Sequence, residues 1–278
     1  PISELASGLA LCPRMSDSAR KRSRTARSAS FDMSGQIVAV TGGSAGIGRA
    51  TCEAFVHAGA AAVYNLDIVS GSSSDAGITW IKTDVSNVAA LKASFAQLLE
   101  AQGGNLDILV SNAGVWTCGD FETVSEEEFD RVTGINVKGA FFAIQAAMPS
   151  LRKRGGTVVV MGSDQSLVGK SEQNLYGMTK GAIGQLTKSL AVQYAPLGVR
   201  VNAVCPGTIE TPLMHKAVGE IAAWKGVLAE DIYGSLGSAQ PIPRVGRPEE
   251  VAQAVLSCCC NEYMTGALVS VDGGYVAA

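Results

Sequence analysis

The feature that most constrains the fold is a regular alternation of short apolar runs with longer helix-like stretches. The apolar runs are rich in Val and Ile and lie at residues 36–40, 61–68, 77–86, 106–114, 156–163, 199–207 and 266–274. They do not alternate apolar with polar residues, which is typical of strands buried on both faces. Repeated strand–helix–strand units with short connections form a parallel sheet with helices on both sides. The sequence therefore predicts an α/β fold, a three-layer, doubly wound parallel sheet.

The helix-like stretches fill most of the remaining chain, at residues 41–60, 87–102, 125–153, 174–196 and 248–260. Residues 208–244 differ, because they contain no clear strand and are rich in Gly, Pro and Met. A long connection of this kind inside a compact domain is usually functional. We therefore expect one doubly wound domain over residues 33–278, with a helical insertion or lid at about 208–244.

The first 32 residues carry six Lys or Arg against three acidic residues and show no apolar periodicity. Arg- and Ser-rich segments are typical of organelle targeting peptides. A disordered leader or an artificial extension fits equally well. We therefore predict a cytoplasmic protein, or one of an organelle lumen or matrix if the leader is a transit peptide. The formal net charge of the whole chain is −3, so we expect no nucleic-acid partner.

The seven cysteines are odd in number and form no CxxC pair, which favours reduced thiols. Three of them are consecutive, at 258–260. Adjacent side chains on a helix point about 100° apart, so we expect no metal site there, only small buried residues and one exposed thiol. The chain has only two histidines, and no apolar run reaches the length of a membrane span. We therefore predict no metal and no membrane partner.

A glycine-rich turn follows the first predicted strand and opens the first helix, in VAVTGGSAGIGRA. Glycines there let the backbone approach a pyrophosphate, and the helix N-terminus supplies N–H donors. The Gly-x3-Gly-x-Gly spacing differs from the common dinucleotide fingerprint. The alternative is a turn that merely needs glycine. The residues expected to hold the phosphates are Thr41, Gly42, Ser44, Gly46, Ile47 and Gly48.

Asp67 ends the second predicted strand, nineteen residues after Gly48. A carboxylate at that place can accept both adenosine ribose hydroxyls and repels a 2′-phosphate. Ala45, just before Gly46, offers no positive charge for such a phosphate. Both observations favour NAD over NADP as cofactor. The alternative is an ordinary turn or capping aspartate.

Six motifs follow one another between residues 35 and 276: TGGSAGIG, DV at 84–85, NAG at 112–114, Asn136, the set Ser163, Tyr176 and Lys180, and PGTIET at 206–211. In order and at the usual intervals, they resemble those of the short-chain dehydrogenase/reductase family. TGGSAGIG matches the cofactor loop, and Ser163, Tyr176 and Lys180 match the catalytic set together with Asn136. The resemblance implies a Rossmann fold and an NAD(P)-dependent oxidoreductase acting on secondary alcohols or ketones. It also implies further cofactor contacts at Asp84, Val85, Asn112, Ala113, Gly114, Tyr176, Lys180, Pro206, Gly207, Ile209 and Thr211.

The spacing of Tyr176 and Lys180 has a physical meaning of its own. Residues i and i+4 share one face of a helix, and a nearby ammonium is expected to lower the tyrosine pKa. Tyr176 could then exchange a proton with a substrate oxygen that Ser163 stabilises. The resemblance implies that Lys180 also binds the nicotinamide ribose and that Asn136 holds a linking water. The alternative for the pair is an ordinary surface contact.

The substrate is less clearly indicated. Polar residues flank the predicted catalytic serine, and an aromatic residue follows the fourth strand, which favours a sugar, sugar acid or polyol oxidised at a secondary alcohol. The alternative is that these side chains simply face solvent. The candidate substrate residues are Trp116, Ser163, Asp164, Gln165, Gln173, Tyr176 and His215.

Two other functions remain open on the same scaffold. A 3-oxoacyl-thioester reductase, or another carbonyl reductase, would be expected to use NADPH and to carry a basic patch for the carrier phosphate. A nucleotide-sensing or structural subunit would be expected to lack the catalytic tyrosine or lysine, and this chain has both. The resemblance further implies a homotetramer, with a homodimer as the alternative, formed through helices rich in small and apolar residues.

Overall fold

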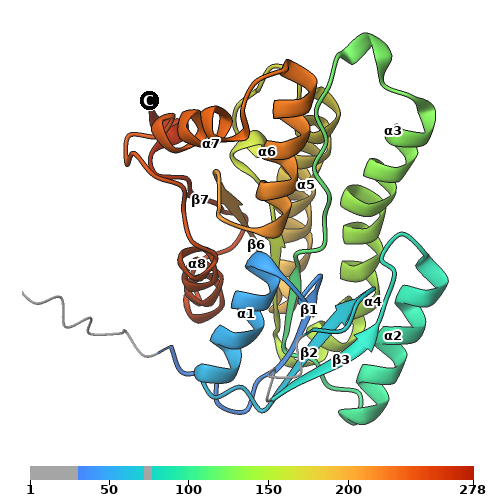
Figure 1. Cartoon of the computed structure of the whole chain (residues 1–278). Helices are drawn as coiled ribbons and strands as arrows, with labels where there is room; N and C mark the ends of the chain where they lie inside the picture. Colours follow the sequence, from blue (N-terminus) through green and yellow to red (C-terminus); the bar gives the residue numbers. More distant parts are fainter. Residues whose placement is uncertain (1–30, 72–76) are drawn as a thin grey trace, which may run out of the picture. The chain divides into compact units, whose positions relative to one another are not determined.

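The computed structural model describes residues 31–71 and 77–278. Seven strands form one sheet in the order β3-β2-β1-β4-β5-β6-β7, and every neighbouring pair is parallel. The order reverses between β1 and β4, as in a doubly wound sheet. The predicted fold class is confirmed (Figure 1). The strands are β1 (Ile37–Thr41), β2 (Ala62–Asp67), β3 (Ile78–Lys82), β4 (Ile108–Ser111), β5 (Thr157–Met161), β6 (Arg200–Pro206) and β7 (Leu268–Val271).

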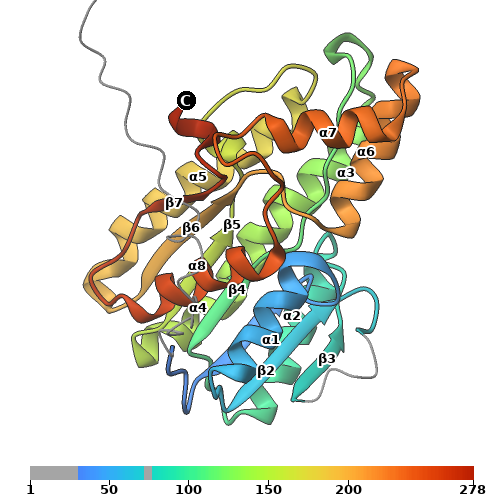
Figure 2. The same cartoon turned by 60° about the vertical axis from the view of Figure 1, so that its left-hand side comes forward.

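Helices cover both faces of this sheet. On one face lie α1 (Gly46–His57) and α8 (Pro248–Cys260), as Figure 2 shows. The other face is covered by α2 (Val88–Ala101), α4 (Ala140–Arg154) and α5 (Asn174–Tyr194). Successive residues of β1 belong to opposite layers: Ala39 packs in one core, Val38 and Val40 in the other. Both faces of the strand are therefore buried, which explains its uninterrupted apolar sequence.

The helix predicted over 125–153 is interrupted in the structure. It is divided into α3 (Glu126–Thr133), a π-helical turn η3 (Gly134–Gly139) and α4. At Gly139 a Cβ atom would come within 3.0 Å of Val85 Cγ2, so a side chain there would collide with the loop after β3. Single π-turns inside helices are frequent at functional sites, and this one carries Asn136.

The segment without strands contains two helices, α6 (Pro212–Lys225) and α7 (Ala229–Ser238). They lie beyond the carboxyl ends of the strands (Figure 1). A parallel bridge between Ile209 and Gly246 joins the two ends of the segment. The chain therefore leaves the sheet after β6, forms a helical pair over its carboxyl edge, and returns to α8.

The basic leader predicted at 1–32 falls almost entirely outside the described residues, so its targeting or disordered character stays a prediction. Within the described part of the chain, no helix combines the length and apolarity needed to cross a membrane. Of the three consecutive cysteines, Cys258 is buried, Cys259 is partly buried and Cys260 is exposed, as predicted. Over residues 31–71 and 77–278, no cluster of three or more His, Cys, Asp or Glu could hold a metal ion.

Candidate active site

A cavity of about 340 Å³ lies at the carboxyl ends of the central strands. Parallel sheets bind ligands at this edge, where the loops after neighbouring strands meet. Fourteen of the predicted cofactor residues and six of the predicted substrate residues line this cavity. The cofactor set is Gly42, Gly46, Ile47, Gly48, Asp67, Asn112, Ala113, Gly114, Tyr176, Lys180, Pro206, Gly207, Ile209 and Thr211. The substrate set is Trp116, Ser163, Asp164, Gln165, Gln173 and Tyr176.

The glycine turn is shaped by close contacts as well as by backbone angles. Gly42 has φ +67° and Gly46 has φ +52°, both in the left-handed region that favours glycine. A Cβ atom on Gly48 would lie 2.0 Å from the Gly42 carbonyl oxygen. The Asn112 side chain braces the turn, because its Nδ2 donates to the carbonyls of Thr41 and Gly42 at 3.1 and 3.0 Å.

The adenosine-side features also meet here. Helix α1 begins after Ala45, whose side chain caps no N–H group, so the first turn keeps donors for an anionic ligand. The Asp67 carboxylate accepts from the backbone N–H groups of Ser44 and Val69 at 3.0 and 3.2 Å. Each carboxylate oxygen has further lone pairs for ribose hydroxyls. The glycine turn, the uncapped helix start and Asp67 together fit a dinucleotide.

Four predicted cofactor residues do not line the cavity. Thr41 is buried, and its Oγ1 accepts from the backbone N–H groups of Asn112 and Ala113. Ser44 Oγ donates to the Val69 carbonyl. Asp84 is exposed and accepts from Ser86, whereas Val85 is buried against Gly139. These residues shape the loops around the cavity.

Helix α5 brings Tyr176 and Lys180 to one side of the cavity. Lys180 Nζ lies 5.6 Å from the centre of the Tyr176 ring and donates to the Met161 carbonyl at 2.8 Å. Lys180 is only 6% exposed. The i, i+4 geometry expected from the sequence is therefore present, with the lysine anchored to the end of β5.

The expected effect on the Tyr176 pKa is wrong for this structure. Burial raises the pKa of Tyr176 above its usual value; the Ser163 hydroxyl opposes this rise and the Asp164 carboxylate adds to it. Burial also lowers the pKa of Lys180 to about 8, because the desolvated ammonium is disfavoured. Desolvation of both groups outweighs the attraction that the sequence suggested between them.

Asn136 lies outside the cavity lining and acts as a clamp. Its Oδ1 accepts from the Val115 N–H at 2.8 Å, and its Nδ2 donates to the Val115 carbonyl at 2.8 Å and to Thr179 Oγ1 at 3.1 Å. The π-turn thus joins the loop after β4 to α5, the helix that carries Tyr176. Asn136 thereby positions the tyrosine's helix.

Ser163 caps the short 3-10 helix η4 (Asp164–Ser166) just after β5. Its Oγ donates to Asp164 Oδ1 at 2.8 Å and accepts from the Gln165 N–H at 3.2 Å. Asp164 Oδ2 accepts from Lys170 Nζ at 2.6 Å. Ser163 is therefore tied to a buried ion pair at the substrate end of the cavity.

Sequence reasoning missed Lys170, which lines the cavity beside Ser163 and Asp164. Asp164 is 2% exposed, and a carboxylate this deeply buried requires a cationic partner nearby. A prediction that Asp164 is buried would have required a nearby cation, and Lys170 lies six residues later in the following loop. Sequence reasoning also missed apolar residues of the insertion that line the cavity. They are Leu213, Met214, Ala217, Ile221 and Leu236.

A second polar group lies in the same region. Gln173 Oε1 accepts from Trp116 Nε1 at 3.1 Å and from Gln165 Nε2. His215 lies elsewhere: its side chain is 56% exposed, 3.5 Å from Glu210 and stacked on Tyr233. The structure therefore brings together every predicted substrate residue except His215.

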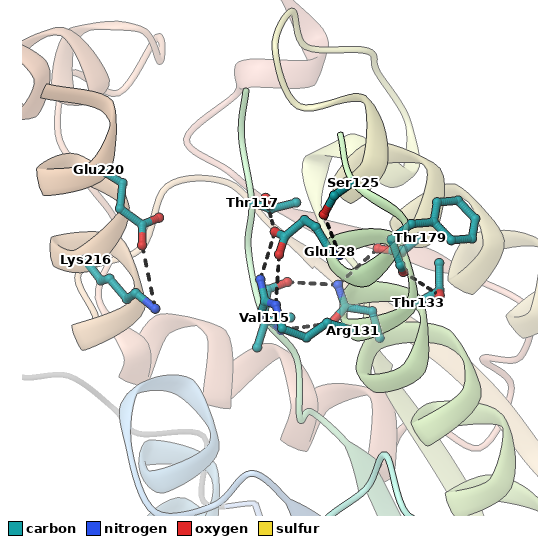
Figure 3. A network of polar contacts seen from close by, with 11 residues as sticks. Val115, Thr117, Ser125, Glu128, Arg131, Thr133, Thr179, Lys216 and Glu220 are labelled. Carbon is teal, nitrogen blue, oxygen red and sulfur yellow. Dashed lines mark hydrogen bonds and ion pairs between the residues drawn. The ribbon is translucent and has the colours of Figure 1, made fainter. Parts of the chain in front are cut away.

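Charged side chains also pair outside the cavity lining, on α3 and on α6 of the insertion. Arg131 binds Glu128 through two N–H groups, and Glu128 also accepts from Thr117 at 2.6 Å. Figure 3 shows the Lys216–Glu220 pair of α6 facing this cluster. At the far end of α6, Lys225 forms an ion pair with Glu172 at 2.9 Å.

Comparison with known proteins agrees with this geometry. A family model described as enoyl-(acyl carrier protein) reductase matches residues 42–276. An uncharacterized oxidoreductase of Thermotoga maritima is 35% identical over 257 residues, which cover 89% of this chain and 100% of that protein. The L-fucose dehydrogenase of Mus musculus is 35% identical over 247 residues, 87% of this chain and 88% of that protein.

Solved structures extend the likeness to the fold. The ligand-free aldohexose dehydrogenase of Thermoplasma acidophilum has a TM-score of 0.81 and 35% identity, and covers 88% of this chain and 96% of its own. A Brucella melitensis 3-ketoacyl-(acyl-carrier-protein) reductase complexed with NADH and ElxO with NADP bound are each 27% identical. The matched sequence, the parallel sheet and the cavity at its carboxyl edge show that the chain is an oxidoreductase of the short-chain dehydrogenase/reductase family.

Proposed function

We propose that this protein is an NAD-dependent dehydrogenase that interconverts a secondary alcohol and a ketone by hydride transfer. The observation that carries the proposal is the meeting of two groups of residues in one cavity. Ser163, Tyr176 and Lys180 lie at one part of the cavity wall, and the glycine turn with Asp67 lies at another. A dinucleotide spanning the cavity would therefore bring its reactive ring to the tyrosine.

The chemistry divides between cofactor and protein. The bound nicotinamide supplies the hydride acceptor or donor. Tyr176 takes the proton of the substrate hydroxyl in oxidation and returns it in reduction. Because burial alone keeps the Tyr176 pKa high, the phenolate must be stabilised by positive charge at the moment of transfer. Lys180, on the same helix face, and the positive charge of an oxidised nicotinamide both act in that direction.

Ser163 stabilises the substrate oxygen in this proposal. Its Oγ carries a single proton, which is donated to Asp164 Oδ1 in the structure. Rotation of that hydroxyl toward a ketone or developing alkoxide would place a donor where negative charge forms. Lys180 would bind the nicotinamide ribose while retaining its contact with the Met161 carbonyl.

Asp67 supports NAD as the preferred cofactor. Its carboxylate lines the cavity at the end of β2, where a 2′-phosphate would meet a negative charge. Ala45, before the helix, offers no compensating cation. The two solved neighbours with NADH and with NADP show that both cofactors occur among similar folds.

The substrate that we propose is a small polar hydroxylated molecule such as a sugar, a sugar acid or a polyol. Asp164, Gln165 and Gln173 supply donors and acceptors at the substrate end of the cavity. The names of two relatives, an L-fucose dehydrogenase and an aldohexose dehydrogenase, agree with this class. The enzyme would work as a homotetramer, with a homodimer as the alternative. Elution at monomer mass in gel filtration at micromolar concentration would count against self-association.

A 3-oxoacyl-thioester reductase is the second candidate, because the similar Brucella melitensis structure is that of a 3-ketoacyl-(acyl-carrier-protein) reductase. That activity would need a cationic patch at the cavity entrance for the carrier phosphate. The two lysines of α6, Lys216 and Lys225, do not line the cavity, and each is paired with a glutamate. Asp67 further disfavours the NADPH that this activity would be expected to use.

The test combines a substrate panel with one substitution. Alcohols, sugars and 3-oxoacyl thioesters are offered with NAD(H) and NADP(H), and turnover is read from nicotinamide absorbance. Tyr176→Phe should abolish turnover while NADH still binds, measured by its fluorescence. Tyr263→Phe is the matched control, because the Tyr263 side chain is fully exposed. Wild-type turnover by Tyr176→Phe would overturn the proposed role.

A further inference from the structure

Lys170 is held in place from two sides at the substrate end of the cavity. Its Nζ donates to Asp164 Oδ2 at 2.6 Å and lies 4.3 Å from the centre of the Tyr275 ring. The ammonium has three N–H groups, and only one is used by Asp164. The Lys170 side chain is 21% exposed, against 3% for Asp164. Lys170 is therefore the member of the pair that a molecule in the cavity can reach.

The ion pair is connected to the predicted reacting centre. Asp164 accepts from Ser163 Oγ through its other carboxylate oxygen. Ser163, in the proposed mechanism, holds the oxygen on the reacting carbon. Ser163 and Lys170 thus bind the two oxygens of one carboxylate, a short span that two oxygens on neighbouring carbons of a substrate can bridge.

The charge of this region selects the kind of group. The described charged residues that line the cavity are Asp67, Asp164, Lys170 and Lys180. In the proposed mechanism Asp67 binds the adenosine ribose, and Lys180 binds the nicotinamide ribose as well as the Met161 carbonyl. The Asp164–Lys170 pair has no net charge, so a substrate carboxylate would gain from the ammonium and be repelled by the aspartate. A hydroxyl accepts from the ammonium without that repulsion.

We propose that Lys170, oriented by Asp164 and Tyr275, determines substrate specificity by binding an uncharged hydroxyl group on the carbon next to the reacting one. The preferred substrates are therefore neutral vicinal diols and polyols, and 2-hydroxy-substituted carboxylic acids are disfavoured. This inference rests on the proposed dehydrogenase function and narrows its substrate class. Lys170 is a substrate-contacting residue here, and Asp164 is a positioning residue.

Three ring compounds that differ at one position test the proposal: 1,2-cyclohexanediol, cyclohexanol and 2-hydroxycyclohexanecarboxylate. A hydrogen bond to a charged donor corresponds to about a ten- to hundredfold preference. We expect kcat/KM with NAD⁺ to be higher for the diol than for either other compound by at least about tenfold. A diol that reacts no better than cyclohexanol would overturn the proposal.

Substitutions then assign the preference to the residue. Lys170→Met should bring the diol-to-cyclohexanol ratio close to one, mainly through a higher KM for the diol. Lys188→Met, at an exposed position on α5, is the control that should keep the wild-type ratio. Asp164→Asn should raise the reactivity of the carboxylate compound relative to the diol, because the Lys170 charge is then no longer neutralised.

Lys170→Met leaves a buried carboxylate without its partner, which can impair folding. The double variant Asp164→Asn/Lys170→Met removes both charges and should lose the diol preference without gaining the acid. Retention of the diol preference in this folded double variant would overturn the role of Lys170. If wild type oxidises cyclohexanol and Tyr176→Phe does not, the dehydrogenase proposal stands separately. If the wild-type protein oxidises none of the three compounds, the result counts against both proposals.

Discussion

Replacing Lys180 by Met should change stability in a way that depends strongly on pH. Lys180 is buried, and burial lowers its pKa from 10.5 to about 8 in the folded protein. At pH 7 the lysine is charged in both the folded and the unfolded chain, so the folded state carries the full cost of the buried charge. That cost is about 3 kcal/mol, since one pKa unit corresponds to about 1.4 kcal/mol.

The cost must fall as the pH rises. Above about pH 8 the folded protein releases the Lys180 proton, while the unfolded chain retains it up to about 10.5. The unfolded state then binds more protons, so the free energy of unfolding increases with pH. Linkage gives a gain of about 2 kcal/mol for wild type between pH 7 and 9.5. Lys180→Met lacks this gain.

The measurement is urea unfolding of both proteins without cofactor at several pH values, followed by circular dichroism. We compare the difference between wild type and Lys180→Met, because titrating groups that do not interact with Lys180 contribute equally to both proteins. The Cys205 thiol is the exception, since Lys180 lowers its pKa. Lys188→Met, at an exposed position, should show no such trend. A difference that stays constant from pH 7 to 9.5 would refute the argument that Lys180 is destabilised by burial.

Four other predictions follow from particular contacts. Gly48→Ala should prevent the glycine turn from forming, seen as lost NADH binding, because its Cβ would lie 2.0 Å from the Gly42 oxygen. Asp67→Ala should weaken the preference for NAD over NADP about tenfold or more, measured as a kcat/KM ratio; an unchanged ratio would place the discrimination elsewhere. Asn136→Ala removes two hydrogen bonds to Val115 and one to Thr179 of α5, and should lower stability by about 2–4 kcal/mol in urea unfolding. Deleting residues 1–32 should leave turnover in vitro unchanged, and a large loss would show that the leader belongs to the fold.

The sheet was predictable because each central strand is buried on both sides and must be apolar throughout. β1 illustrates this: Val38 and Val40 serve one core and Ala39 the other. The interruption of the helix at 134–139 was not predictable, since a π-turn preserves the same local residue types. It exists because Gly139 fits against Val85 and Asn136 reaches Val115, both long-range contacts.

In the site, too, features set by the local sequence could be predicted, whereas features set by tertiary contacts could not. The spacing of Tyr176 and Lys180 predicted a shared helix face, which the structure has. The direction of the shift in the Tyr176 pKa could not be predicted from the sequence, because it depends on how far folding removes the side chain from water. Lys170 was not predicted, because the burial of its partner Asp164 is evident only in the folded chain. His215 was predicted to contact substrate because it lies in the expected lid, whereas its side chain is exposed and contacts Glu210 and Tyr233.

Helix α6 carries two chemically different surfaces, which would respond differently to the surroundings of the protein. Its cavity side is apolar, with Leu213, Met214 and Ala217, whereas Lys225 attaches its end to Glu172 through an exposed ion pair. Dissolved salt screens exposed charges but leaves apolar contacts in place. Raising the ionic strength should therefore weaken the attachment at the end of α6 while leaving its apolar contacts with the cavity unchanged.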